Sequence, residues 1–230
     1  MEEREEKAAA VAGALDVFSR EGYASATMQA IAAAAGVTRR KLTYHYTDKR
    51  SLYRAALQQA GRNLVPPPEV LERSYAVPVE GMRRFIDALF HCFLRNPDAV
   101  RLVARENLDP VLGRGEAMEI EELAAVTLHI ERLLLLGQDS GAFRPEVSAD
   151  DILLMLCSLC MFRASNQHTA LSLANVDMAT QRNTEGMRRL TIDTVLAFLT
   201  SNIPPSGYDS YVEPLETPQK AEYDLNKGIY

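Results

Sequence analysis

A short helix, a glycine turn and a second short helix are expected in the segment TMQAIAAAAGVTRRKLTYHYTDK, residues 27–49. Thr27 is a good helix N-cap, and Gly36 readily adopts the positive φ that ends a helix. Thr38 can cap the next helix, in which Leu42 is one of only two apolar anchors. Because such a helix cannot lie in a core, the pattern predicts a helix-turn-helix whose second helix is exposed.

The exposed helix carries side chains that suit DNA. An α-helix fits the major groove, which is about 12 Å wide, and residues near the helix N-terminus reach the base edges. Arg39 and Arg40 occupy those positions, and an arginine can donate two hydrogen bonds to one guanine. Lys49 begins a further helix after the predicted cap Asp48, where the helix dipole favours a phosphate. We therefore expect the arginines to read sequence and Lys49 to contact the DNA backbone.

The distribution of charge agrees with this interpretation. Residues 20–62 contain eight Lys or Arg and two acidic residues, although the formal net charge of the chain is −6. Because phosphates repel the acidic remainder, affinity for DNA is expected at one end of the chain. Basic residues on a helix are often only a solvated face. Here the ordered succession of cap, glycine turn, cap and basic helix favours DNA binding.

These motifs resemble the DNA-binding domain of TetR-family transcriptional regulators. The resemblance covers residues 8–57 and rests on the string ALDVFSREGYASATMQAIAAAAGVTRRKLTYHYTDKRSLY. It implies DNA contacts at Thr27, Thr38, Arg39, Arg40, Lys41, Tyr44, His45 and Lys49. Two positions depart from the family pattern, since Thr43 stands where Tyr is usual and Arg40 where a small residue or Pro is common. Thr43 stays a candidate contact, and the departures suggest phosphate anchoring by Tyr44 or His45 and a more G-rich operator.

The rest of the chain also has helical patterns, so the predicted fold class is all-α. Residues 1–64 are expected to form the helix-turn-helix domain, residues 65–203 a helical ligand-binding and dimerisation domain, and residues 204–230 a disordered or surface-draped tail. Five helices are expected in the second domain. The first ends at Asn96, the second spans 98–108, and the third extends from beyond Gly115 to Leu136. The fourth begins after a cap at Ser148 or Asp150, and the fifth spans 181–201.

One helix of the second domain contains an uninterrupted apolar run. Residues 152–162 read ILLMLCSLCMF, which is apolar on every side and predicts burial all round. A membrane span needs about 20 apolar residues, so this run is too short. The charged start MEEREEKAAA is unlike a secretory signal peptide, and the three cysteines are too few for a disulfide framework. We therefore expect a cytoplasmic protein in a reducing compartment.

The resemblance also implies a regulatory domain. In the TetR family the last two helices form a four-helix dimer interface, and the middle helices enclose a pocket whose small-molecule effector changes the spacing of the DNA modules. The expected apolar lining is Phe85, Leu89, Phe93, Met155, Leu159 and Phe162, and the polar candidates are His91, Arg101, Arg105, Asn107, His129 and Asn166. For each residue a core or solvated role is also open, because an apolar stripe at helical spacing usually faces a core.

Other classes of function have less support. Cys157 and Cys160 form a C-x-x-C inside an apolar helix, which favours buried core residues over a redox sensor or a metal site. The chain has no GxSxG, HExxH or glycine-rich phosphate loop, so we expect no enzyme, no catalytic residues, no metal and no cofactor. The leading prediction is a dimeric, ligand-responsive repressor that binds a palindromic DNA operator as a homodimer. The alternative is a ligand-independent DNA-binding regulator whose C-terminal bundle serves only dimerisation.

Overall fold

The computed structural model describes residues 2–113, 121–204, 207 and 211–212. Every regular element in this part of the chain is a helix. In order they are α1 (Glu2–Ser25), α2 (Met28–Ala34), α3 (Arg39–His45), α4 (Lys49–Asn63), α5 (Pro68–Leu71), α6 (Pro78–Arg95), α7 (Pro97–Leu108), α8 (Glu121–Asp139), α9 (Ala149–Ser165), α10 (Gln167–Ala174) and α11 (Gln181–Leu199). None of these helices is long and apolar enough to span a membrane.

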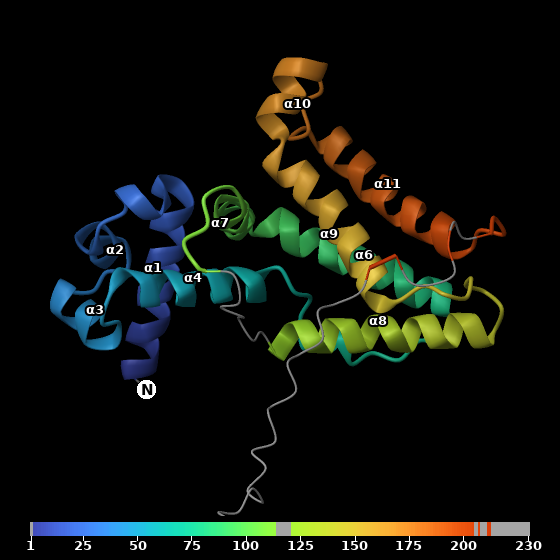
Figure 1. The fold of residues 1–230 in the computed structure, drawn as a ribbon, viewed down its shortest axis with the longest axis horizontal. Helices are drawn as coiled ribbons and strands as arrows, with labels where there is room; N and C mark the ends of the chain where they lie inside the picture. The colour runs from blue at the N-terminus through green and yellow to red at the C-terminus, as the bar shows by residue number, and fades with distance from the viewer. Residues whose placement is uncertain (1, 114–120, 205–206, 208–210, 213–230) are drawn as a thin grey trace, which may run out of the picture.

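Helices α1–α4 form an N-terminal module at one end of the molecule (Figure 1). Its core is built around Phe18 of α1 and Tyr53 of α4, whose rings meet edge to face with centroids 5.0 Å apart. Gly13 lets α1 approach the end of α2 closely, because a Cβ at this position would lie 2.7 Å from the Ala35 nitrogen. Leu42 anchors α3 on this core and is fully buried. The partly buried Tyr46 at the C-cap of α3 packs on the same core, so these two anchors hold α3 while most of that helix lies outside.

The long first helix differs from its predicted bounds. The apolar spacing of residues 5–21 and the glycine that follows them predict a support helix that ends at Gly22, but α1 extends from Glu2 to Ser25. Gly22 still marks a break, because its φ of 79° interrupts the helix before the last turn. That conformation is costly for residues with a Cβ, which explains the glycine.

Helices α6, α8, α9 and α11 form a C-terminal bundle, and α7 lies between this bundle and the N-terminal module (Figure 1). Phe85, Ile86 and Phe90 of α6 are almost fully buried at its centre. Helix α7 packs against α1 and α4 on one side and against α9 on the other. The bundle can therefore influence the module through α7 and through the end of α4.

Most predicted helices of the bundle are confirmed. Helices α6, α7 and α11 match their expected ranges to within two or three residues, and Ser148 caps α9 by accepting a hydrogen bond from the Asp151 amide. The short helices α5 and α10 were not predicted from the sequence. Part of the expected start of α8 lies at 114–120, outside the described residues. Of the predicted tail, residues 205–206, 208–210 and 213–230 are also outside them, whereas Tyr211 packs on Phe198 with ring centroids 5.8 Å apart.

The prediction that α9 is buried all round is wrong for the single chain. Ile152, Leu156 and Cys160 face the core, but Leu154 and Phe162 are each 52% exposed. An apolar helix can face a core on one side and a partner molecule on the other, and periodicity does not distinguish the two. The exposed side of α9 is therefore available for an interface.

Candidate nucleic-acid interface and effector cavity

The turn between α2 and α3 has the geometry of a helix-turn-helix. Thr27 Oγ1 accepts a hydrogen bond of 3.0 Å from the Ala30 amide, and Thr38 Oγ1 accepts one of 3.2 Å from the Lys41 amide. Gly36 has a φ of 64°, as its predicted role in ending α2 requires. The two caps and the glycine set the direction of α3, which confirms the local structure expected from the sequence.

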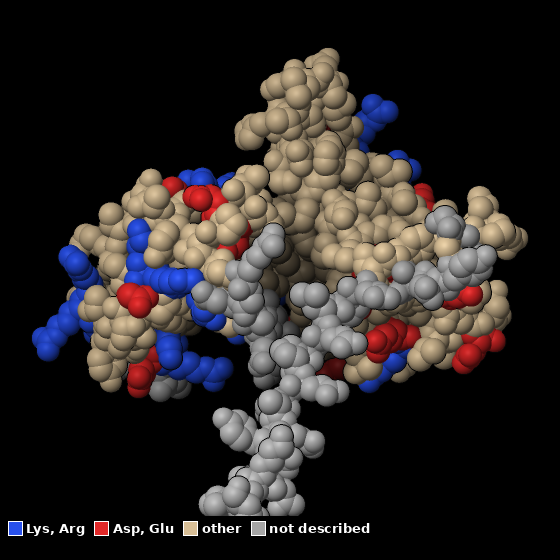
Figure 2. Space-filling view, viewed as in Figure 1, with Lys and Arg blue, Asp and Glu red and all other residues tan. Residues whose placement is uncertain are grey.

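The outer surface of α3 is polar and mostly exposed. Arg39, Arg40, Lys41 and Thr43 are exposed, and 78% of the Tyr44 side chain is accessible to solvent. Figure 2 shows Lys and Arg side chains gathered around the end of the molecule that α1–α4 form. This surface has the shape and charge of a helix that can enter a DNA groove.

Three side chains of α3 are engaged with the protein itself. Lys41 forms an ion pair with Glu6 of α1, and His45 Nε2 lies 3.6 Å from the same carboxylate. The hydrogen bond from Lys41 keeps the pKa of Glu6 below its usual value. Thr43 Oγ1 donates to the carbonyl oxygens one turn back, at 3.0 Å and 3.1 Å.

Arg39, Arg40 and Tyr44 are therefore the side chains of α3 that point away from the protein. In the described parts of the chain neither guanidinium has a hydrogen bond or an ion pair, and the Tyr44 ring lies edge-on to the ring of His45, with centroids 5.2 Å apart. An arginine in that state can use its whole fork of donors for a base or a phosphate.

The Lys49 ammonium, expected to contact a DNA phosphate, is hydrogen-bonded to the protein itself. Its Nζ donates to the carbonyl oxygens of Tyr23, at 2.7 Å, and Ala26, at 2.9 Å, and lies 4.4 Å from the centre of the Tyr23 ring. The start of α4 is already capped by Asp48, whose carboxylate accepts a hydrogen bond from the Ser51 amide. The Lys49 ammonium thus holds the end of α1 against α4, and a phosphate contact by this side chain stays a prediction.

Replacing Lys49 by Ala is expected to lower the free energy of unfolding by about 1.5–3 kcal/mol, because carbonyls at the end of α1 lose a charged donor. Urea unfolding of the full chain measures this, with Lys7→Ala as a control that removes an exposed lysine from α1. Unchanged stability together with uniformly weaker DNA binding would instead assign Lys49 to a phosphate.

Helix α7 is hydrogen-bonded to the N-terminal module at two points. Tyr53 donates from its hydroxyl to Glu106 at 2.8 Å, and burial is the main reason that the pKa of Tyr53 is raised. Arg105 donates to the carbonyl oxygens of Ser19, at 2.9 Å, and Arg20, at 2.8 Å. Arg105 was predicted as a polar residue of the pocket, whereas in the structure its guanidinium holds the end of α1.

A predominantly apolar cavity of about 370 Å³ lies where the end of α4 meets the C-terminal bundle. Its lining residues are Gly61, Leu64, Val65, Leu89, Phe93, Val103, Asn107, Leu123, Val126, Leu153, Cys157 and Met161. Asn107 supplies an amide, and its Nδ2 donates to the Val103 carbonyl. Burial raises the pKa of the Cys157 thiol to about 11, so this side chain is neutral near pH 7. The cavity suits a largely apolar molecule of modest size.

Three of the predicted pocket residues, Leu89, Phe93 and Asn107, line this cavity. The other predicted residues are held elsewhere or do not reach it. His91 lies beside Asp87, Arg101 pairs with Asp98 on the surface, and Asn166 lies at the junction of α9 and α10. The half-buried Met155 and Leu159 and the exposed Phe162 are not among the lining residues.

His129 and Phe85 pack against each other, with ring centroids 5.4 Å apart, rather than lining the cavity. The Leu71 carbonyl accepts a hydrogen bond of 2.7 Å from His129 Nδ1, and burial lowers the pKa of this histidine. The contribution of Gly61 of α4 and of Leu64 and Val65 just after it was not predicted, because the boundary between the two domains was placed between Leu64 and Val65 and no cavity was expected across it.

Cys157 and Cys160 of the C-x-x-C lie within α9. Burial is the main reason that the pKa of Cys160 is raised to about 12, and the thiol of Cys157 is also kept protonated. A protonated thiol is a poor nucleophile and a poor metal ligand. In the described part of the chain no group of three or more His, Cys, Asp or Glu is placed to hold a metal ion.

An all-helical chain with an exposed basic α3, set by two threonine caps and a glycine turn, defines a helix-turn-helix DNA-binding protein. Residues 10–56 match the family model described as bacterial regulatory proteins of the tetR family. Residues 78–195 match the model described as the tetracyclin repressor-like C-terminal domain. The chain belongs to the TetR family of transcriptional regulators. The family and the relatives described next are regulators rather than enzymes.

Known relatives agree with this membership. The transcriptional repressor NicS of Pseudomonas putida is 28% identical over 167 residues, which cover 72% of this chain and 79% of NicS. The transcriptional regulator RutR of Escherichia coli is 30% identical over 102 residues, 44% of this chain and 48% of RutR. SCO4942 of Streptomyces coelicolor, at 20% identity and a TM-score of 0.59, aligns over 83% of this chain and 95% of its own. The hemolysin II regulator HlyIIR is 17% identical, with a TM-score of 0.55. Its alignment covers 86% of this chain and 99% of HlyIIR. These two structures support the fold.

Proposed function

We propose that this chain is a repressor that binds a palindromic operator as a homodimer in the cytoplasm and leaves it when an apolar effector occupies the cavity beside α4. The observation that carries the proposal is the double role of α4. This helix packs in the core of the N-terminal module through Leu52 and Tyr53, and its last residues form a wall of the cavity. A ligand that displaces the end of α4 changes the position of the reading helix.

The DNA contact is assigned to the outer surface of α3 and its supports. Arg39 and Arg40 are the proposed base readers, and Tyr44 is the proposed phosphate anchor because His45 is turned toward Glu6. The remaining proposed positions, which border the same surface, are Thr27, Thr38, Lys41, Thr43 and Lys49. Lys41 can contact DNA only after exchanging or sharing its ion pair with Glu6.

The dimer is assigned to the exposed apolar face of α9 and α11. Leu154 and Phe162 of α9 and Leu190 of α11 are each about half exposed, and the small Ser158 lies between the first two. Apolar side chains gathered on two adjacent helices favour association with an identical face. A two-fold dimer presents two reading helices, which must be about 34–36 Å apart to enter successive major grooves.

The test of the DNA-binding role is selection of bound duplexes from a random pool by the full chain at one stated salt concentration. We expect a palindromic motif with half-site centres about one helical turn, or a multiple of it, apart. The Arg39→Ala, Arg40→Ala double variant serves as the matched control and is expected to lose the motif. Enrichment of the same motif by parent and variant, or no enrichment by the parent, would contradict the proposal.

The cavity is expected to bind a neutral apolar dye, N-phenyl-1-naphthylamine, with saturable fluorescence at one site per chain. Val126→Phe fills part of the cavity and is expected to weaken this binding by about tenfold or more, a difference of about 1.4 kcal/mol. Leu128→Phe, on the exposed side of the same helix, is the matched control and should bind like the parent. Equal binding by the Val126 variant would show that the dye sits elsewhere, and no binding by the parent would favour a bundle used only for dimerisation.

A further inference from the structure

A second hollow lies between α6, α11 and the segment that precedes α6. Its volume is about 540 Å³, within the range of roughly 300–1,000 Å³ that is usual for small-molecule sites. It shares no lining residue with the apolar cavity. Five arginines from three separate segments line it, against two aspartates, in a chain of net charge −6. The arginines are Arg73, Arg83, Arg84, Arg188 and Arg189.

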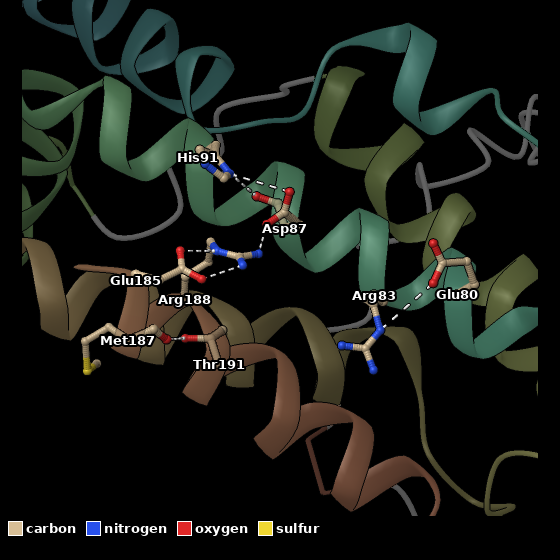
Figure 3. Close-up of polar contacts among 8 residues, drawn as sticks. All are labelled: Glu80, Arg83, Asp87, His91, Glu185, Met187, Arg188 and Thr191. Carbon is tan, nitrogen blue, oxygen red and sulfur yellow. Dashed lines mark hydrogen bonds and ion pairs between the residues drawn. The ribbon is translucent and has the colours of Figure 1, made fainter. Parts of the chain in front are cut away.

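Three of these arginines have carboxylate partners. Arg188 of α11 lies between Asp87 of α6, at 2.5 Å, and Glu185 of its own helix, at 2.7 Å (Figure 3). His91 is also beside Asp87, with Nδ1 at 3.7 Å from the carboxylate. These bonds raise the pKa of Arg188, first through Glu185 and then through Asp87. The guanidinium is therefore always charged and is fixed in position between two helices.

Arg83 and Arg84 share one acidic residue. Glu80 lies 2.7 Å from Arg84 Nε and 4.0 Å from Arg83 Nε, and both arginine side chains are about half exposed. One carboxylate does not neutralise two guanidiniums, so these side chains keep positive charge and free donors at the edge of the hollow. A pair this exposed is also weak, which leaves both arginines able to turn toward a ligand.

Arg73 and Arg189 form no ion pair or hydrogen bond with a carboxylate within the described residues, although the charge of Arg189 contributes to lowering the pKa of Glu185. The Arg73 guanidinium lies over the Tyr75 ring, 5.5 Å from its centre. In this arrangement the N–H donors at the edge of the guanidinium stay available. Tyr75 and Ile192 give the same hollow an apolar surface. The lining of the hollow therefore combines cationic hydrogen-bond donors with an apolar surface.

We propose that this arginine-lined hollow, defined by Arg73, Arg83, Arg84, Arg188 and Arg189, binds a compact organic oxyanion, a carboxylate or phosphate attached to a small apolar body. Guanidinium groups bind both headgroups through two parallel charge-assisted hydrogen bonds. An anion placed there also offsets the positive charge that the neighbouring carboxylates leave uncompensated, and a ring or short chain can pack on Tyr75 and Ile192. The site is separate from the apolar effector cavity and does not depend on DNA binding.

Calorimetric titration of the full chain without DNA tests the site at constant ionic strength. The probes are phenyl phosphate and phenylacetate, which differ in headgroup, and benzyl alcohol, which has the same apolar body without charge. We expect saturable binding of at least one anion at one site per chain and none of the alcohol. Binding of one anion alone would identify the headgroup. Equal binding of the alcohol, or no binding of either anion, would overturn the proposal.

The variants Arg73→Gln and Arg189→Gln, combined in one chain, are expected to weaken anion binding by about tenfold or more. Arg182→Gln, an exposed arginine in the first turn of α11 outside the hollow, is the matched control and should stay within about twofold of the parent. Melting temperatures and molar masses measured without ligand show whether each variant is folded and dimeric. Binding by the folded double variant equal to that of the parent would exclude this site.

Discussion

Two acidic substitutions on the exposed face of α9, Leu154→Glu with Phe162→Glu, are expected to convert the proposed dimer to a monomer and to weaken operator binding by about 10²–10⁴-fold. The large effect follows from geometry, because a monomer holds one half-site and loses the effective concentration that links the two reading helices. Both side chains are half exposed, so a charge there is solvated in the monomer and is buried only in the dimer. The molar mass in solution and the affinity for the selected operator measure the two consequences.

Leu108→Glu is the matched control, because Leu108 is an exposed leucine at the end of α7, outside the α9 and α11 face. This control should stay dimeric and bind the operator like the parent. A dimer of parent affinity in the Leu154 and Phe162 variant would place the interface elsewhere. If circular dichroism shows that the Leu154 and Phe162 variant is unfolded, Leu190→Glu on α11 tests the same face from the other helix.

The local structure of the helix-turn-helix could be predicted because its determinants are close in sequence. A threonine cap acts on an amide three residues later, as Thr27 does on Ala30 and Thr38 on Lys41. Gly36 ends a helix through its own φ. No distant residue is needed for these features, so the ends of α2 and α3 follow from a single stretch of chain.

The partners of charged side chains could not be predicted, because they come from distant segments. Arg105 donates to carbonyls 85 and 86 positions earlier in the chain, and Lys49 reaches back to Tyr23 and Ala26. Both residues look like ligand-binding cations in the sequence, and in the structure both donate hydrogen bonds to carbonyls at the end of α1. The same reason explains the arginine-lined hollow, whose members are spread between Arg73 and Arg189.

The sequence predicted which apolar residues lie on helix stripes, but not whether each one lines the cavity, packs in the core or lies on the surface. Leu89 and Phe93 reach the cavity, Phe85 reaches the core, and Phe162 reaches the surface, although all four lie on apolar helix stripes. A stripe of period 3.6 indicates that a helix face is covered, and it does not say by what. The resemblance implied a pocket among the middle helices, whereas the part of the cavity wall at the end of α4 could be found only from the fold.

Removing either of the proposed base-reading arginines is expected to lower sequence discrimination without unfolding the module. Arg39→Ala and Arg40→Ala each remove an exposed side chain that has no hydrogen bond within the described residues, so the structure of α3 should be retained. Each good pairing of an arginine with guanine contributes about 1–3 kcal/mol of discrimination, a factor of roughly 5 to 150. Competition between the selected operator and single-base variants, at fixed salt, measures this loss at each position.

Lys7→Ala is the matched control because it removes one positive charge from the same module outside α3. It should change the affinity for all duplexes by a similar small factor, since a distant charge acts on the phosphates alone. The arginine variants should instead lose preference at particular base pairs, and the two positions should differ because Arg39 and Arg40 point in directions about 100° apart around the helix. Discrimination unchanged in both arginine variants would move base reading to Tyr44 or to the side chains that border α3.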